Sequence, residues 1–141
     1  QMSVNAGLPT SGRIFISVNP MDREAILPIA SALRQAGFTL VATTGTRGFL
    51  EENGIPAELI YKIHEGRPNV IDLLTDGHVG LMINTPIGRE SHEDDYELRR
   101  AAIIHNVPYT TTIAGAVAAV NGIHSLQDRP LSVRCIQEYH S

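Results

Sequence analysis

The residues best suited to chemistry are one lysine and a short run of threonines. Lys62 is the only lysine among 11 basic residues, and its ammonium group is a compact charge that suits a phosphate. Thr43, Thr44 and Thr46 surround Gly45 in a Thr-Thr-Gly-Thr sequence. Hydroxyl groups and the free backbone N–H groups of a helix start also bind phosphate. Together these residues predict a site for a small molecule that carries a phosphate.

Each of these residues also has an interpretation that involves no ligand. The threonines could be helix N-caps, and Lys62 could be an exposed surface lysine. Ser17 and Asn84 could be turn residues whose side chains bond to nearby backbone. The phosphate site is favoured because the expected fold brings all of them to one place.

Strand-like and helix-like segments alternate along the chain. We expect strands at 13–18, 38–42, 59–61, 79–83 and 107–110, and helices at 19–36, 46–53, 69–75, 90–105 and 113–120. Strand followed by helix, five times over, predicts an α/β fold. Its expected form is a three-layer α/β/α sandwich around a five-stranded parallel sheet, which is Rossmann-like. Residues 131–136 could add a strand or cap the sheet edge.

Polar side chains follow every expected strand. Ligands of open parallel sheets bind at the carboxyl ends of the strands, so these side chains should share one rim. In strand order they are Ser17, Thr43 to Thr46, Lys62, Asn84 with Thr85, and Thr111.

Composition limits the other possibilities. The chain has 141 residues, 43% of them hydrophobic, and a net charge of -4, which fits one domain without a broad surface for nucleic acid. Its single cysteine, Cys135, fits a reducing cytoplasm. We expect no membrane span and no secretory signal. Residues 1–11 are expected to be a linker from a preceding domain, and residues 12–141 the domain itself.

Other motifs point to no further chemistry. His64-Glu65 and His92-Glu93 have metal-ligand residue types but lack metal-ligand spacing, so no metal site is expected. The acidic residues from 90 to 97 suit a solvated helix start. We find no Walker loop and no Gly-x-Gly-x-x-Gly, which argues against a nucleotide hydrolase or a dinucleotide site.

Several motifs in combination resemble a known family. Ala42–Thr46 and Lys62–Pro68 are similar to the methylglyoxal-synthase-like superfamily. Ile83–Arg89, the segment 94–102 and Pro108–Thr112 narrow the resemblance to the C-terminal regulatory domain of carbamoyl-phosphate synthetase large chains. The resemblance runs from about Gly12 into the tail.

The resemblance implies a regulatory domain without catalytic residues or a cofactor of its own. Its effectors would be UMP and, in some bacteria, IMP. The family's phosphate contacts fall on Arg23, Thr43, Thr46 and Lys62, although Arg23 stands where some members have lysine. Ser17, Asn84 and Thr85 match pocket positions. Thr111 matches a position near an ornithine site that needs the catalytic domain as well.

The intact enzyme implied by the resemblance makes carbamoyl phosphate from glutamine, bicarbonate and ATP, for pyrimidine and arginine synthesis. It would need ATP with Mg²⁺ or Mn²⁺ outside this domain. The expected partners are the catalytic domains of the same large chain, a small glutaminase subunit and a second copy of this domain.

Two relatives of similar fold are the alternatives. Methylglyoxal synthase eliminates phosphate from dihydroxyacetone phosphate with an Asp in a Gly-Gly-Asp loop after the third strand. Here that loop reads Glu65-Gly66-Arg67, so a cation stands where the general base would be. The cyclohydrolase domain of purine synthesis shares the threonine motif but differs after the third strand.

Overall fold

The computed structural model describes residues 7–63, 65–86 and 92–138. Their five strands form one parallel sheet in the order β3-β2-β1-β4-β5. The strands are β1 (Arg13–Ser17), β2 (Thr39–Ala42), β3 (Glu58–Leu59), β4 (Leu81–Asn84) and β5 (Tyr109–Thr110). The expected five-stranded parallel sheet is therefore confirmed.

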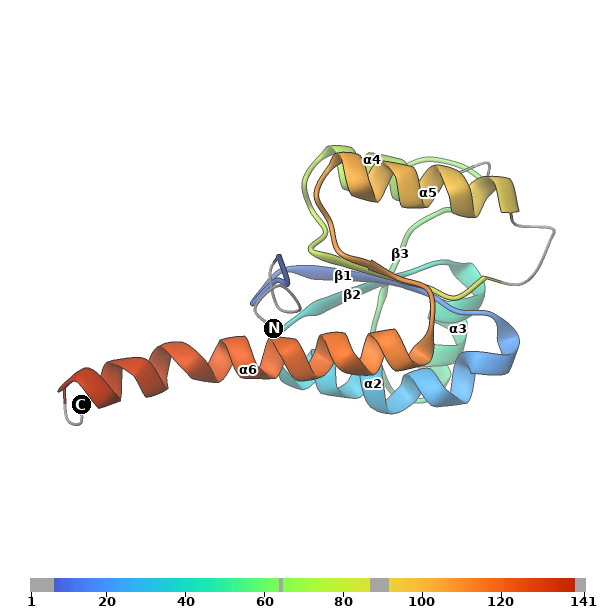
Figure 1. Cartoon of the computed structure of the whole chain (residues 1–141). Helices are drawn as coiled ribbons and strands as arrows, with labels where there is room; N and C mark the ends of the chain where they lie inside the picture. The colour runs from blue at the N-terminus through green and yellow to red at the C-terminus, as the bar shows by residue number, and fades with distance from the viewer. Residues whose placement is uncertain (1–6, 64, 87–91, 139–141) are drawn as a thin grey trace.

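Helices cover both faces of the sheet. In Figure 1, α2 and α6 lie on one face and α4 and α5 on the other. The helical elements are η1 (Pro20–Asp22), α2 (Arg23–Gln35), α3 (Thr44–Glu52), α4 (Val70–Thr75), α5 (His92–Ile104) and α6 (Ile113–Glu138). This arrangement confirms the three-layer sandwich.

Alternate residues of the central strand supply two separate cores. Ile14 and Ile16 pack in the cluster that includes α2, α3 and α6, whereas Phe15 packs in the cluster that includes α4 and α5. Successive side chains of a strand point to opposite faces, so a sheet covered on both faces needs apolar residues throughout. The register of β1 and β4 sets Ser17 beside Asn84 at the carboxyl end of the sheet.

Three expected helix boundaries are wrong. The helix expected from Asn19 starts at Arg23, after the short 3-10 helix η1. The helix expected from Thr46 starts earlier, at Thr44 with Thr43 as its N-cap. The helix expected to end at 120 continues to Glu138, so residues 131–136 are helical and add no strand. Packing supports the helix as far as Gln127, because Ile123 is fully buried and Gln127 Nε2 donates to the backbone carbonyls of Thr10 and Ala36.

The segment just before β1 is packed against the domain. Leu8 contacts the core. Pro9 packs against Gly80, since a Cβ added to Gly80 would lie only 2.7 Å from the Pro9 side chain. The backbone carbonyl of Thr10 accepts a hydrogen bond from Gln127. The linker role expected for residues 1–11 stays a prediction. None of the helices in the described ranges is both long and apolar enough to cross a membrane.

Candidate functional site

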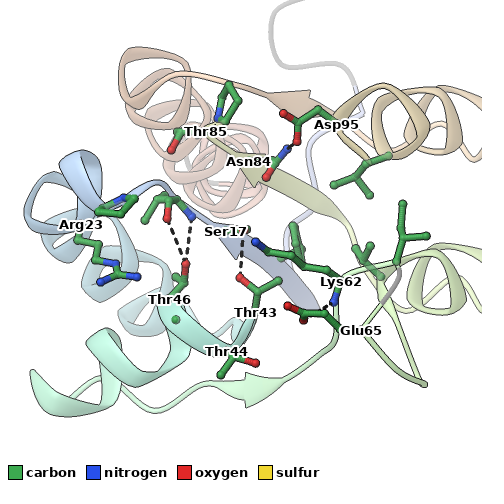
Figure 2. Close-up of a pocket in the computed structure, with 18 residues that line it drawn as sticks. Ser17, Arg23, Thr43, Thr44, Thr46, Lys62, Glu65, Asn84, Thr85 and Asp95 are labelled. Carbon is green, nitrogen blue, oxygen red and sulfur yellow. Dashed lines mark hydrogen bonds between the residues drawn. The ribbon is translucent and has the colours of Figure 1, made fainter. Parts of the chain in front are cut away.

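A pocket opens at the carboxyl ends of the strands, where the strand order reverses between β1 and β4. Its cavity of about 160 Å³ far exceeds the space for one water, which is roughly 10–15 Å³. The fold places ligands of open α/β sheets at this position. Seven of the residues singled out from the sequence line it: Ser17, Arg23, Thr43, Thr46, Lys62, Asn84 and Thr85 (Figure 2).

The start of α3 faces this pocket without a side-chain cap. Thr43 is the N-cap, but its hydroxyl makes no capping bond and instead donates to Ser17 Oγ at 3.0 Å. The first N–H groups of a helix have no partner inside the helix, so those of Thr44 and Gly45 depend on solvent or a ligand. The first turn also carries no acidic residue, which leaves the positive end of the helix dipole available to an anion.

Two of the predicted hydroxyls are already engaged with backbone. Thr46 Oγ1 accepts from the N–H of Val18 at 3.1 Å, and Thr85 Oγ1 accepts from the N–H of Asn19 at 2.9 Å. Both threonines are buried. They tie the loop after β1 to α3 and β4, so they shape the pocket wall. Their direct contact with a phosphate stays a prediction.

Two cationic side chains approach the start of α3 from opposite sides (Figure 2). Arg23, at the start of α2, lies over Gly45, where a Cβ would come within 2.7 Å of its Nη2 atom. Its Nε is buried and, among the described residues, has no hydrogen-bond partner. Lys62 is half-buried and its amino group points toward Ser17. The two cations therefore flank the uncapped start of α3.

The other side of the pocket carries acidic and amide groups. Asn84 Nδ2 donates to Asp95 Oδ1 at 3.0 Å and to the hydroxyl of Tyr109 at 2.9 Å. Glu65 also lines the pocket, and its Oε1 accepts from the backbone N–H of Lys62 at 3.1 Å. The sequence argument overlooked Asp95 in this role. Its position in the first turn of a helix that follows β4 is the signal that could have found it.

Burial raises the pKa of the Tyr109 phenol, and the negative charge of Asp95 raises it further. The hydrogen bond from Asn84 and the positive charge of Arg99 oppose this shift. The Arg99 guanidinium lies 5.8 Å from the centre of the Tyr109 ring. The phenol is therefore neutral at physiological pH and remains a hydroxyl partner for Asn84.

Some candidates lie elsewhere. Thr111 does not line the pocket, and it sits at the junction of β5 and α6. Arg67 is outside the lining as well and pairs with Asp72 at 2.7 Å, so it does not replace a general base inside the pocket. His64 and the side chains of His92 and Glu93 lie outside the described residues. Within the described part, no three His, Cys, Asp or Glu side chains gather as metal ligands would.

The fold and the pocket together define a three-layer α/β domain with a polar pocket, lined by two cations and two acids, at the switch point of its sheet. The family model for the MGS-like domain matches residues 25–111, and the chain belongs to that family. It is 44% identical over 141 residues to the carbamoyl phosphate synthase large chain of Archaeoglobus fulgidus. It is 42% identical over 139 residues to that of Myxococcus xanthus.

The matched relatives are much longer proteins. The chain covers 99% of its own length in these matches but only 13% of either large chain. It covers 26% of a relative described as the large chain's C-terminal section, from Methanopyrus kandleri, at 43% identity. The fold also matches the crystal structure of methylglyoxal synthase from Elizabethkingia anophelis, with a TM-score of 0.64 and 14% identity over 80% of this chain and 79% of that one. At that identity the match supports the fold alone.

Proposed function

We propose that the chain is an effector-binding regulatory domain of a carbamoyl phosphate synthase large chain. Its pocket binds the phosphate of a nucleoside monophosphate, UMP or IMP, and performs no chemistry on it. The observation that carries this proposal is the uncapped start of α3, which faces a pocket that Arg23 also lines. Lys62 supplies the second cation.

These groups suit a phosphate dianion in particular. A guanidinium offers N–H donors in a planar fork, whereas an ammonium is a point charge. Backbone N–H groups at a helix start add donors and a favourable dipole. The site therefore combines directional donors with two positive charges. A neutral ligand would not interact with these charges as strongly as a phosphate dianion does.

Regulation then follows from linkage. An effector alters carbamoyl phosphate synthesis only if its affinity differs between the active and inactive arrangements of the catalytic domains. Such coupling is typically about 1–3 kcal/mol. In the intact cytoplasmic enzyme, the catalytic domains bind ATP with Mg²⁺ or Mn²⁺ and work with the glutaminase subunit. Thr111, away from the pocket, is the contact proposed for an ornithine site completed by the catalytic domain.

Titration calorimetry of the chain with UMP, IMP and uridine tests the pocket. We expect one nucleotide to bind and uridine, which lacks the phosphate, to bind far more weakly. Arg23→Ala should weaken nucleotide binding at least tenfold, since charged hydrogen bonds contribute about 1.5–3 kcal/mol. Arg34→Ala is the matched control, because Arg34 lies in the last turn of the same helix. Failure of both nucleotides to bind at millimolar concentration would refute the proposal.

A lyase of the methylglyoxal synthase type is the second candidate, and the carboxylate of Glu65 in the pocket lining favours it. Proton abstraction needs a carboxylate within hydrogen-bond reach of the substrate carbon. Glu65 is exposed, and its carboxylate is held by the backbone N–H of Lys62. We therefore expect no methylglyoxal from dihydroxyacetone phosphate. Turnover that is lost in Glu65→Gln would establish the lyase instead.

A further inference from the structure

The side of the pocket away from Arg23 contains a hydrogen-bond network that phosphate binding leaves unexplained. Asn84 ends β4, Asp95 lies in α5 and Tyr109 begins β5. Asn84 is only 6% exposed. Asn84 and Asp95 line the pocket, whereas Tyr109 does not. Three separate elements thus meet at one side-chain amide.

The network fixes which way the amide of Asn84 faces. An asparagine amide has two N–H donors, and here Nδ2 donates to Asp95 and to Tyr109. The reversed orientation would set Oδ1 against the Asp95 carboxylate, with two acceptors facing each other. Figure 2 shows the amide nitrogen turned toward Asp95 and the oxygen turned away from it. The atom of Asn84 left to contact a ligand is therefore Oδ1, a hydrogen-bond acceptor.

We propose that Tyr109 is a positioning residue that, together with Asp95, holds the Asn84 amide so that Oδ1 accepts a hydrogen bond from the ligand. The ligand class is then a phosphate monoester that carries a hydroxyl or N–H group at its far end. This inference rests on the proposed function, because it assigns the second half of the same pocket.

Tyr109 matters because Asp95 can engage only one of the two hydrogens. Removing the phenol oxygen leaves the other N–H of Asn84 unpaired in a buried site, which is unfavourable. Asp95 then holds the amide through one N–H alone, so the amide can tilt and Oδ1 is no longer fixed toward the ligand. A ligand hydroxyl would then make a weaker hydrogen bond to Oδ1, while the phosphate-binding groups at α3 would be unchanged.

The test compares two monoesters of similar charge, ribose 5-phosphate and methyl phosphate. We expect the wild-type chain to bind ribose 5-phosphate more tightly. In Tyr109→Phe this preference should fall by roughly 3–10-fold, the range of one hydrogen bond, with methyl phosphate affinity unchanged. Tyr96→Phe is the matched control, because Tyr96 is an exposed tyrosine of α5. It should keep the wild-type preference.

The possible results distinguish failure of the phosphate site from failure of the role proposed for Tyr109. If neither monoester binds the wild-type chain, the phosphate site of the proposed function fails, and this inference falls with it. If both bind and Tyr109→Phe keeps the full preference, only the role of Tyr109 is overturned. Should Tyr109→Phe not fold, NMR of the wild-type chain decides. The Asn84 side-chain amide protons should exchange slowly with solvent, and rapid exchange of both would refute the locked amide.

Discussion

Two helices start beside the same pocket and treat their first N–H groups in opposite ways. At α4, Asn69 accepts from the N–H groups of Ile71 and Asp72, and Asp72 accepts from the N–H of Asn69 in return. At α3, the N-cap Thr43 makes no such bond. Val70 and Thr44 both line the pocket, so the two helix starts lie close together but differ in whether a side chain caps them.

The difference indicates where this domain keeps donors for a ligand. A complete capping box stabilises a helix start and leaves few free N–H groups. An uncapped start gives up that stabilisation and retains a positive end that an anion can satisfy. Two further features at α3 fit a retained anion site: the Thr43 hydroxyl is turned to Ser17, and the Arg23 guanidinium lies over Gly45. The comparison predicts that changes at α3 alter binding and changes at α4 alter stability.

The largest effect is expected from Lys62→Ala. Loss of a charged hydrogen bond to the phosphate should reduce UMP or IMP affinity by about 1.5–3 kcal/mol, measured by calorimetry, while the thermal unfolding midpoint stays near that of the wild type. Arg67→Ala is the control, because Arg67 is a nearby cation outside the pocket lining. Unchanged affinity in Lys62→Ala would remove this lysine from the site.

Asn69→Ala should produce the reverse pattern. It removes the acceptor for two N–H groups at the start of α4, so the free energy of unfolding should fall by about 1–2 kcal/mol. Denaturant unfolding measures this loss. Asn69→Asp keeps an acceptor oxygen for both N–H groups but loses the hydrogen bond to the Ile63 carbonyl, so it should recover part of the stability. Effector affinity should stay within about twofold, well below the tenfold of 1.4 kcal/mol. A loss of affinity without a loss of stability would mean that the two starts are not functionally distinct.

Gly45→Ala should weaken binding without weakening the fold. The new Cβ would come within 2.7 Å of Arg23 Nη2, and the flexible guanidinium must move away from the helix start. We expect a loss of about 1 kcal/mol in effector affinity, since one charged donor is displaced. Gly48→Ala is the control, because a Cβ at Gly48 meets nothing within 4 Å. Equal affinities of the two variants would show that the position of Arg23 over Gly45 does not matter.

The contrast between the two helix starts could not be predicted from the sequence, although the sheet and the position of the site could. Alternation of apolar strands and amphipathic helices was enough to predict the sheet and to gather Ser17, Thr43 and Lys62 at one rim, because the carboxyl ends of parallel strands share an edge. The sequence indicated Thr43 as a possible N-cap and Asn69 only as the first residue of an expected helix, yet in the structure Asn69 makes the capping bonds and Thr43 does not. Whether such a residue caps its helix depends on partners distant in sequence. The hydroxyl of Thr43 bonds to Ser17, at the end of the neighbouring strand, and so is not used for capping.

Long-range contacts explain the other differences as well. Asp95 belongs to a run of acids that a local reading assigns to solvent, yet the fold brings it within 3.0 Å of Asn84 Nδ2. The extension of α6 from residue 120 to Gln127 is supported by the burial of Ile123 and by the hydrogen bonds of Gln127 to Thr10 and Ala36. Local spacing carries no information about such contacts.

A small gain in stability is expected from Thr44→Asp, which makes the start of α3 resemble that of α4. Thr44 is the exposed first residue of α3, and α4 already carries Asp72 in its first turn. An acid there should interact favourably with the helix dipole and raise the free energy of unfolding by about 0.3–1 kcal/mol. Thr44→Asn is the uncharged control and should give less of this gain.

The same substitution should weaken effector binding, because the new carboxylate competes with the phosphate for the same N–H groups. Calorimetry at low and high salt should show both the stability gain and the affinity loss shrinking as charges are screened, with a Debye length of about 10 Å at 0.1 M. If Thr44→Asp gains stability and keeps full effector affinity, the phosphate binds away from the start of α3. The uncapped start would then be a feature of the fold rather than of the site.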